Sequence, residues 1–173
     1  LLTDIVNMKN SKKILYFAFL LFVAFITTGC DKKEFYPASD IQIVKAEPFN
    51  ILPTSSDFDS IEDGVVTAKL INSIPCELVS YDLSYRTVLN EPIESLTITD
   101  IPINIPFPEA DTETDITLKP YQRQVLDLLN NTSSNISPIR ATVTLHFRDV
   151  NKNEVIRNAS FLLYKYIETA SSD

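Results

Sequence analysis

The chain has 173 residues, 45% of them apolar, with two Gly, two Cys, one His, no Trp and a formal net charge of −8. One His and two Cys are too few for a protein-only zinc site of the usual kind, and two isolated glycines cannot form a phosphate-binding loop or a dinucleotide fingerprint. An acidic chain without a cluster of Lys and Arg is repelled by phosphate. We therefore expect one domain, or one domain plus an appendage, with no cofactor and no nucleic-acid partner.

The start of the chain has a charge of the opposite sign. Residues 1–29 carry a net charge of +2, so the rest of the chain carries −10. Met8 is the only methionine and the natural start of translation, so residues 1–7 are either untranslated or follow an alternative start codon. A segment with three lysines precedes an unbroken apolar run over residues 14–26. This order of a basic segment, a short apolar core and small residues predicts a signal-peptide helix within residues 1–29.

The apolar run is followed by Thr27, Thr28, Gly29 and Cys30. These residues resemble the lipobox of bacterial lipoproteins. The resemblance implies cleavage between Gly29 and Cys30, acylation of the Cys30 thiol and of the new amino terminus, and attachment to a membrane. Two or three acyl chains would hold a protein stably, because each buried methylene contributes about 0.8 kcal/mol. An ordinary signal peptide with an incidental cysteine and an uncleaved membrane anchor are the alternatives.

The rest of the chain is interpreted as a domain behind a short tether. Residues 30–40 lack periodicity and are expected to be the lipidated cysteine and the tether, followed by a sandwich domain at 41–168 and a tail at 169–173. Once Cys30 carries lipid, Cys76 has no partner for an internal disulfide. We expect Cys76 to pack as a small apolar residue, with an intermolecular disulfide as the alternative.

Apolar and polar residues alternate along most of the domain, which is the pattern of half-buried strands. The pattern is clearest where Val79, Tyr81, Leu83 and Tyr85 alternate with short polar residues. A polar turn at 149–153 between two such segments predicts a hairpin, because Asn and Asp tolerate tight turns. About seven strands predict an all-β, antiparallel sandwich. The alternating segments are 41–44, 64–71, 79–86, 96–99, 101–108, 116–118, 142–148 and 154–166.

The layout of these strands is similar to that of immunoglobulin-like and fibronectin-type domains, which occur in many envelope lipoproteins. The chain has neither the Trp nor the cysteine pair of an antibody domain. One segment is ambiguous, since Tyr121, Val125, Leu128 and Leu129 fit one face of a helix whereas residues 124–129 also fit a strand. We favour the strand, because the surrounding pattern is β throughout.

Prolines interrupt one of the predicted strands. In the segment 101–108, Ile101, Ile103, Ile105 and Phe107 alternate with Pro102, Asn104, Pro106 and Pro108. Because proline cannot donate to a ladder, this strand is expected at the edge of a sheet. One interpretation is an edge protected against aggregation, whose isoleucines fill the core. The other is an edge that docks a partner. The candidate residues for that partner site are Ile101, Pro102, Ile103, Ile105, Pro106 and Phe107.

Carboxylates follow this strand at alternate positions and recur in the hairpin turn. Asp111, Glu113 and Asp115, together with Asp149, are weak candidates for calcium ligands, although the chain has no complete calcium loop. Solvated acidic loops are the simpler interpretation. His146 lies on the polar face of a predicted strand, so we expect it to face solvent.

No constellation of catalytic residues accompanies these features. We therefore expect a lipoprotein of the bacterial cell envelope, held to membrane lipid through Cys30 and facing the periplasm or the exterior. Its sandwich would be a non-catalytic module that binds or supports another envelope protein. A calcium-dependent adhesion or stability module is the alternative, followed by a small hydrolase that uses His146, Cys76 or the carboxylates.

Overall fold

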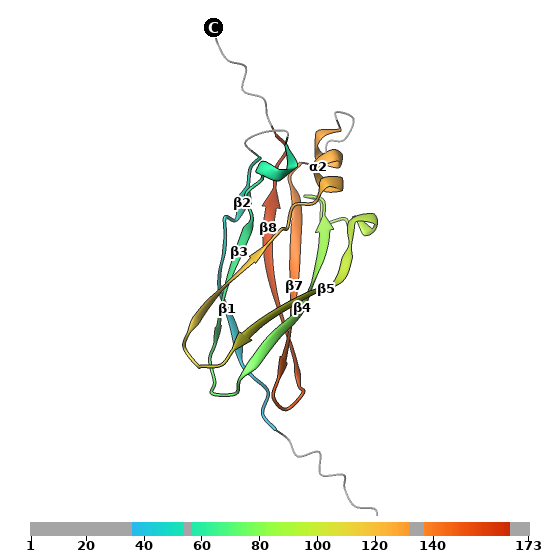
Figure 1. Cartoon of the computed structure of the whole chain (residues 1–173). Helices are drawn as coiled ribbons and strands as arrows, with labels where there is room; N and C mark the ends of the chain where they lie inside the picture. Colours follow the sequence, from blue (N-terminus) through green and yellow to red (C-terminus); the bar gives the residue numbers. More distant parts are fainter. Residues whose placement is uncertain (1–35, 54–56, 132–136, 167–173) are drawn as a thin grey trace, which may run out of the picture. The chain divides into compact units, whose positions relative to one another are not determined.

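The computed structural model describes residues 36–53, 57–131 and 137–166, and the described residues from Ala38 onward form one compact unit (Figure 1). The predicted all-β sandwich is confirmed: two sheets pack around a common core. The strands are β1 (Ile41–Glu47), β2 (Asn50–Ile51), β3 (Gly64–Leu70), β4 (Cys76–Arg86), β5 (Ile98–Phe107), β6 (Glu113–Leu118), β7 (Ile139–Asp149) and β8 (Glu154–Leu163). The helices are η1 (Phe58–Ser60), η2 (Glu94–Leu96) and α2 (Arg123–Asn130). The predicted signal-peptide helix, the cleavage site at Gly29 and Cys30, and the tail lie outside the described residues.

The strand order is that of an immunoglobulin-like sandwich. One sheet has the order β1-β3-β6 and the other has the order β2-β8-β7-β4-β5. β1, β3 and β6 take the places of strands A, B and E, and β8, β7, β4 and β5 take those of G, F, C and C′. β1 also lies against β8, so these two strands share one side of the sandwich while β6 and β5 share the other. One departure from the antiparallel prediction is the two-residue β2, which pairs with β8 in parallel.

The core lies between the inner faces of the two sheets. Tyr85, Phe107, Phe147 and Phe161 are its largest fully buried side chains. The rings of Phe107 and Phe147 meet edge to face with 5.4 Å between their centroids, a favourable geometry for aromatic pairs. Gly64 is required where the chain passes Phe161, because a Cβ at this position would lie 2.8 Å from the aromatic ring.

The two ends of the sandwich carry different elements. The turn between β3 and β4 and the turn between β7 and β8 lie at one end, whereas η1 and α2 lie at the other (Figure 1). The predicted hairpin is confirmed, since β7 and β8 pair continuously from Ile139↔Leu163 to Arg148↔Glu154. No helix among the residues described is long and apolar enough to cross a bilayer.

The strand favoured for residues 124–129 is wrong, because this segment is part of the helix α2. A strand would have placed Val125, Asp127 and Leu129 on one face and buried the carboxylate. The helix instead buries Val125, Leu126 and Leu129 and leaves Asp127 exposed. The Tyr121 hydroxyl, just before the helix, donates to the Tyr164 carbonyl oxygen at 2.6 Å. This contact across 43 residues has no local signal in the sequence.

The inward face of β4 also differs from the prediction. The ladders on both sides of β4 shift register between Leu78 and Ser80. An extra residue in one strand changes the phase of the alternation, so Leu78 is fully buried and Val79 is only half-buried. Beyond the shift, Leu83 and Tyr85 point into the core as predicted.

Candidate functional sites

β5 contains the proline-interrupted segment and lies at the edge of the five-stranded sheet, as predicted. Pro102, Asn104 and Pro106 are exposed, while Ile101, Ile103 and Ile105 are half-buried against the core and Phe107 is fully buried. The alternation is therefore as expected, but the three isoleucines do not fill the core completely. Their partial exposure leaves an apolar strip along the inner face of β5.

The prolines reduce the number of backbone hydrogen-bond donors at the free edge of β5. Pro102 and Pro106 lie opposite Ser80 and Glu77 in the β4 ladder. Because proline has no N–H, neither Pro102 nor Pro106 can donate a hydrogen bond to a strand added at this edge. This edge is poorly suited to accept an added strand, which favours the interpretation of a protected edge.

His146 lies on the outer face of the five-stranded sheet, as predicted, but it is only partly exposed because it bridges two carboxylates. Its Nε2 lies 2.9 Å from Asp82 Oδ2 on β4, and its Nδ1 lies 3.0 Å from Glu154 Oε1 on β8. The side chains are 19% (His146), 26% (Asp82) and 64% (Glu154) exposed. The sequence could not reveal this group, because strand pairing brings together residues that are 64 positions apart.

The two carboxylates determine the protonation of His146. Burial opposes the charged ring, but the hydrogen bonds and negative charges of Asp82 and Glu154 outweigh it and raise the pKa of His146. Burial also opposes ionisation of Asp82, yet the backbone N–H of Asp100 and the His146 ring lower its pKa. Both ring nitrogens are engaged, so neither is left to accept a proton from a hydroxyl nucleophile. This arrangement is an ion-pair cluster rather than a catalytic triad.

Asp149, one of the calcium candidates, is a buried carboxylate that organises the hairpin turn. The backbone N–H groups of Asn151 and Asn153 donate to its Oδ1, both at 2.8 Å. The side-chain Nδ2 of Asn153 at 2.9 Å and the Ser39 N–H at 3.2 Å donate to its Oδ2. Burial opposes ionisation, but these donors together lower the pKa of Asp149. The carboxylate is thus committed to internal hydrogen bonds.

The other three calcium candidates are engaged or dispersed. Asp111 pairs with Lys69 at 3.1 Å, and the Thr67 hydroxyl donates to Asp115 at 2.6 Å. Glu113 is exposed on β6. Within residues 36–53, 57–131 and 137–166, no group of three or more His, Cys, Asp or Glu side chains is arranged to hold a metal ion.

Residues 38–40 belong to the sandwich and not to the tether, which corrects the predicted boundary. The Ser39 hydroxyl donates to the Ile74 carbonyl oxygen at 2.8 Å, and the Asp40 N–H donates to Asn72 Oδ1 at 3.1 Å. Asn72 Nδ2 in turn donates to the Ala38 carbonyl oxygen at 2.9 Å. With the Ser39–Asp149 contact, these bonds fix the entering segment to the end that carries the β3–β4 and β7–β8 turns. The sequence signal for a tether, polar residues without periodicity, could not reveal bonds to partners 32 to 110 residues away.

Cys76 is a buried free thiol at the start of β4, as predicted for a cysteine that packs as a small apolar residue. Burial raises the pKa of its thiol and outweighs the opposing hydrogen bond with Ser39. A neutral, buried thiol is a poor nucleophile, so the position gives no support to a cysteine-based activity.

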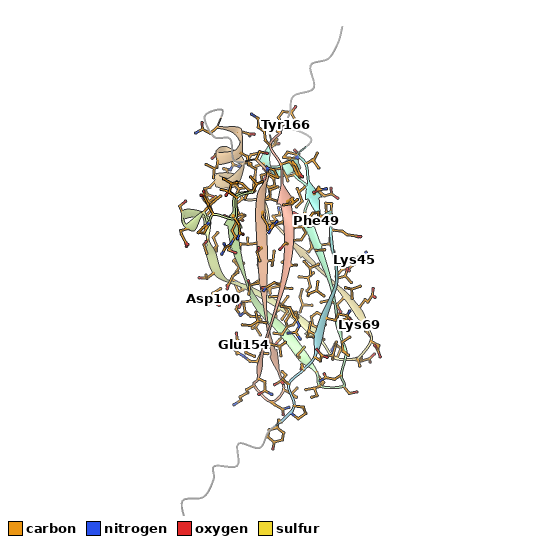
Figure 2. All side chains as sticks on the ribbon, turned by 180° about the vertical axis from the view of Figure 1, so that it is seen from behind. Lys45, Phe49, Lys69, Asp100, Glu154 and Tyr166 are labelled. Atoms are coloured by element: carbon orange, nitrogen blue, oxygen red, sulfur yellow. The ribbon has the colours of Figure 1, made fainter. Side chains whose placement is uncertain are left out.

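A broad, open depression of about 790 Å³ lies beside the end of β1. Phe49, 53% exposed, lines it together with the ion pair of Lys45 and Glu47, and with Glu62 and Asp63. Figure 2 shows Lys45 and Phe49 along the same side of the domain. No pattern in the sequence indicates this surface, because Phe49 lies in a short segment without alternation.

Comparison with models of known protein families and with curated protein sequences finds no match to this chain.

Proposed function

We propose that the protein is a lipoprotein of the bacterial cell envelope, anchored in a membrane through Cys30, whose sandwich is a non-catalytic module that binds another envelope component. The observation that carries this proposal is the sequence Thr27-Thr28-Gly29-Cys30 directly after the apolar run at residues 14–26. Acylation at one cysteine with two or three chains is sufficient for stable attachment.

The bonding of residues 38–40 supports a tethered module with a defined orientation. Residues 31–37 connect Cys30 to the fixed segment and span at most about 28 Å when extended. The chain enters the sandwich at the end with the β3–β4 and β7–β8 turns, so this end would face the membrane. The end with α2 would face away from the membrane, and the strand edges along the sides would be accessible to a partner.

The chemistry of the two residues suited to nucleophilic catalysis supports binding over hydrolysis. Both nitrogens of His146 contact carboxylates, and Cys76 is buried and neutral. Both side chains make their contacts within the domain, as we expect for a module that acts through its surface.

Metabolic labelling with an alkynyl fatty acid in a bacterial host tests the anchor. We expect the wild-type chain and the Cys76→Ala variant to take up label and to fractionate with membranes, and the Cys30→Ala variant to do neither. Equal labelling of the Cys30→Ala variant would refute the lipid anchor.

The binding role is tested separately by photocrosslinking in intact cells. A photoreactive residue in place of Thr117 on β6 or Thr142 on β7 samples two different surfaces of the sandwich. We expect one reproducible crosslinked envelope protein from one position and none from the other. Absence of a specific product at both positions, and at further exposed edge and loop positions, would argue against a binding module.

A further inference from the structure

The two sheets of the sandwich differ in width on the side that β5 and β6 share. The five-stranded sheet ends in β5, while the three-stranded sheet ends in β6, so no strand formed by the described residues continues the smaller sheet opposite β5. The strip of Ile101, Ile103 and Ile105 on the inner face of β5 packs against the core but is only half-buried. These isoleucines lie where a strand added to β6 would cover them.

β6 is also the strand edge that best accepts such an addition. Among the four edges that the described residues form, β5 carries prolines, β2 has two residues, and β1 has a register shift between Ile43 and Lys45. The carbonyl oxygen of Ile41 on β1 further accepts from Arg157 Nε. β6 pairs with β3 through six consecutive residues without a shift, and it contains no proline. Its other edge therefore presents a regular row of backbone donors and acceptors.

The side chains of β6 specify the chemistry of the added strand. Ile116 and Leu118 point into the core, whereas Glu113, Asp115 and Thr117 are exposed on the outer face. Neighbouring strands place residues of the same face side by side, so an added strand would have apolar residues inward and basic residues beside Glu113 and Asp115. A second copy of β6 would instead place carboxylates near one another, which disfavours self-association through this edge.

We propose that β6 binds an extended segment of a partner protein in which apolar and basic residues alternate, and that this segment becomes a fourth strand of the smaller sheet. The main-chain bonds to β6 supply affinity, and contact with Ile103 and Ile105 together with pairing to Glu113 supplies specificity. The proposal deepens the proposed function, since it rests on the sandwich being a binding module and identifies the kind of partner that it takes.

The test uses the full chain purified in detergent and a short synthetic peptide in which Val and Lys alternate. We expect binding of this peptide and slower amide hydrogen exchange at residues 113–118. A peptide in which Val and Glu alternate, and a peptide in which the same Val and Lys residues form two blocks, should not bind. Equal binding of the block peptide, or protection absent from β6, would overturn the proposal.

Substitutions test whether the peptide binds at the edge of β6. Glu113→Lys should weaken peptide binding by about threefold to fivefold, because a cross-strand pair of opposite charge is lost. The matched control is Glu91→Lys, which makes the same charge change in the exposed β4–β5 loop and should leave affinity unchanged. Ile103→Ser should weaken binding through the apolar strip, and its melting temperature reports whether the domain remains folded. An equal effect of Glu91→Lys would show non-specific charge attraction and refute the site.

This outcome is independent of the lipid anchor. Peptide binding by the Cys30→Ala variant with unchanged affinity would support the strand site even where the fatty-acid label is absent. Successful labelling without peptide binding would retain the anchor and refute strand addition. If the full chain forms a dimer whose β6 amides are protected without peptide, the β6 edge binds a second copy of the chain. That result would overturn the proposal.

Discussion

Asp149→Asn removes the charge that joins the hairpin turn to the entering segment. In the native protein, two donors contact each oxygen of this carboxylate. An amide keeps one oxygen, so two of the four donors lose their acceptor in either orientation of the side chain. Ser39 is only 4% exposed, which prevents water from compensating fully at its N–H. Because hydrogen bonds to charged groups contribute more than neutral ones, we expect a loss of about 2–3 kcal/mol in the free energy of unfolding.

Urea unfolding at neutral pH measures this loss, and Asp111→Asn is the matched control. The Asp111 side chain is 76% exposed in its pair with Lys69, so its removal should change stability by less than about 1 kcal/mol. Hydrogen exchange at Ser39 should accelerate in Asp149→Asn and not in the control. A loss of stability in Asp149→Asn no larger than in Asp111→Asn would refute the assignment of Asp149 as the organiser of this end.

The dependence on pH gives a second test of the same carboxylate. Its pKa in the folded state is below the unfolded value of 3.8, so its stabilisation is present above pH 3.8 and is lost as the pH falls through the lowered value. The difference in stability between the wild type and Asp149→Asn should therefore shrink in acid. A difference that stays constant down to about pH 2 would contradict the lowered pKa.

Three further predictions concern other parts of the fold. The pKa of His146 is raised above 6.5, so its stabilisation is complete below pH 6.5 and is lost as the pH rises through the folded value. The free energy of unfolding measured in urea should therefore fall across this range, and His146→Gln should abolish the fall; an unchanged fall in the variant would disprove the pairing. Gly64→Ala should cost about 1–3 kcal/mol in thermal unfolding because the added Cβ collides with Phe161, and a neutral result would contradict the close approach. Leu129→Ala in α2 should cost about 2–5 kcal/mol while the half-buried Leu128→Ala costs less, and equal costs would contradict the buried face of the helix.

Local patterns predicted the strands because each alternation needs only the period of the extended chain. The prolines of β5 likewise predicted an edge strand, since their missing donors exclude a central position. The α2 helix was missed because Tyr121, Val125, Leu128 and Leu129 fit one face of a helix whereas residues 124–129 also fit a strand, and the choice depends on Asp127 being exposed at the end of the sandwich. Only the folded chain fixes that exposure.

Polar groups were the least predictable feature, for a related reason. The polar sequence neighbours of Asp149 suggest a metal ligand, but one of its hydrogen-bond donors comes from Ser39, 110 positions earlier. The alternation along β7 predicts that His146 faces solvent, but the adjacent strands bring carboxylates to both ring nitrogens. A pattern along one strand gives the face of a side chain and not the residues across the ladder, which determine its chemistry.

The fixed entering segment and the open edge of β6 are connected through β3. Glu113 lies opposite Lys69 in the β3–β6 ladder, near the end of β3. The turn that follows β3 binds Asp40 through Asn72 and Ile71. The acidic end of β6 thus lies at the end of the domain that a lipid on Cys30 would hold near the membrane. A partner strand would run alongside β6 with its basic residues beside Glu113 at this same end, where an anionic bilayer would also attract positive charge. The anchor and the strand edge would therefore favour the same partner chemistry, and membrane-bound protein should bind the alternating Val and Lys peptide more tightly than protein in neutral detergent.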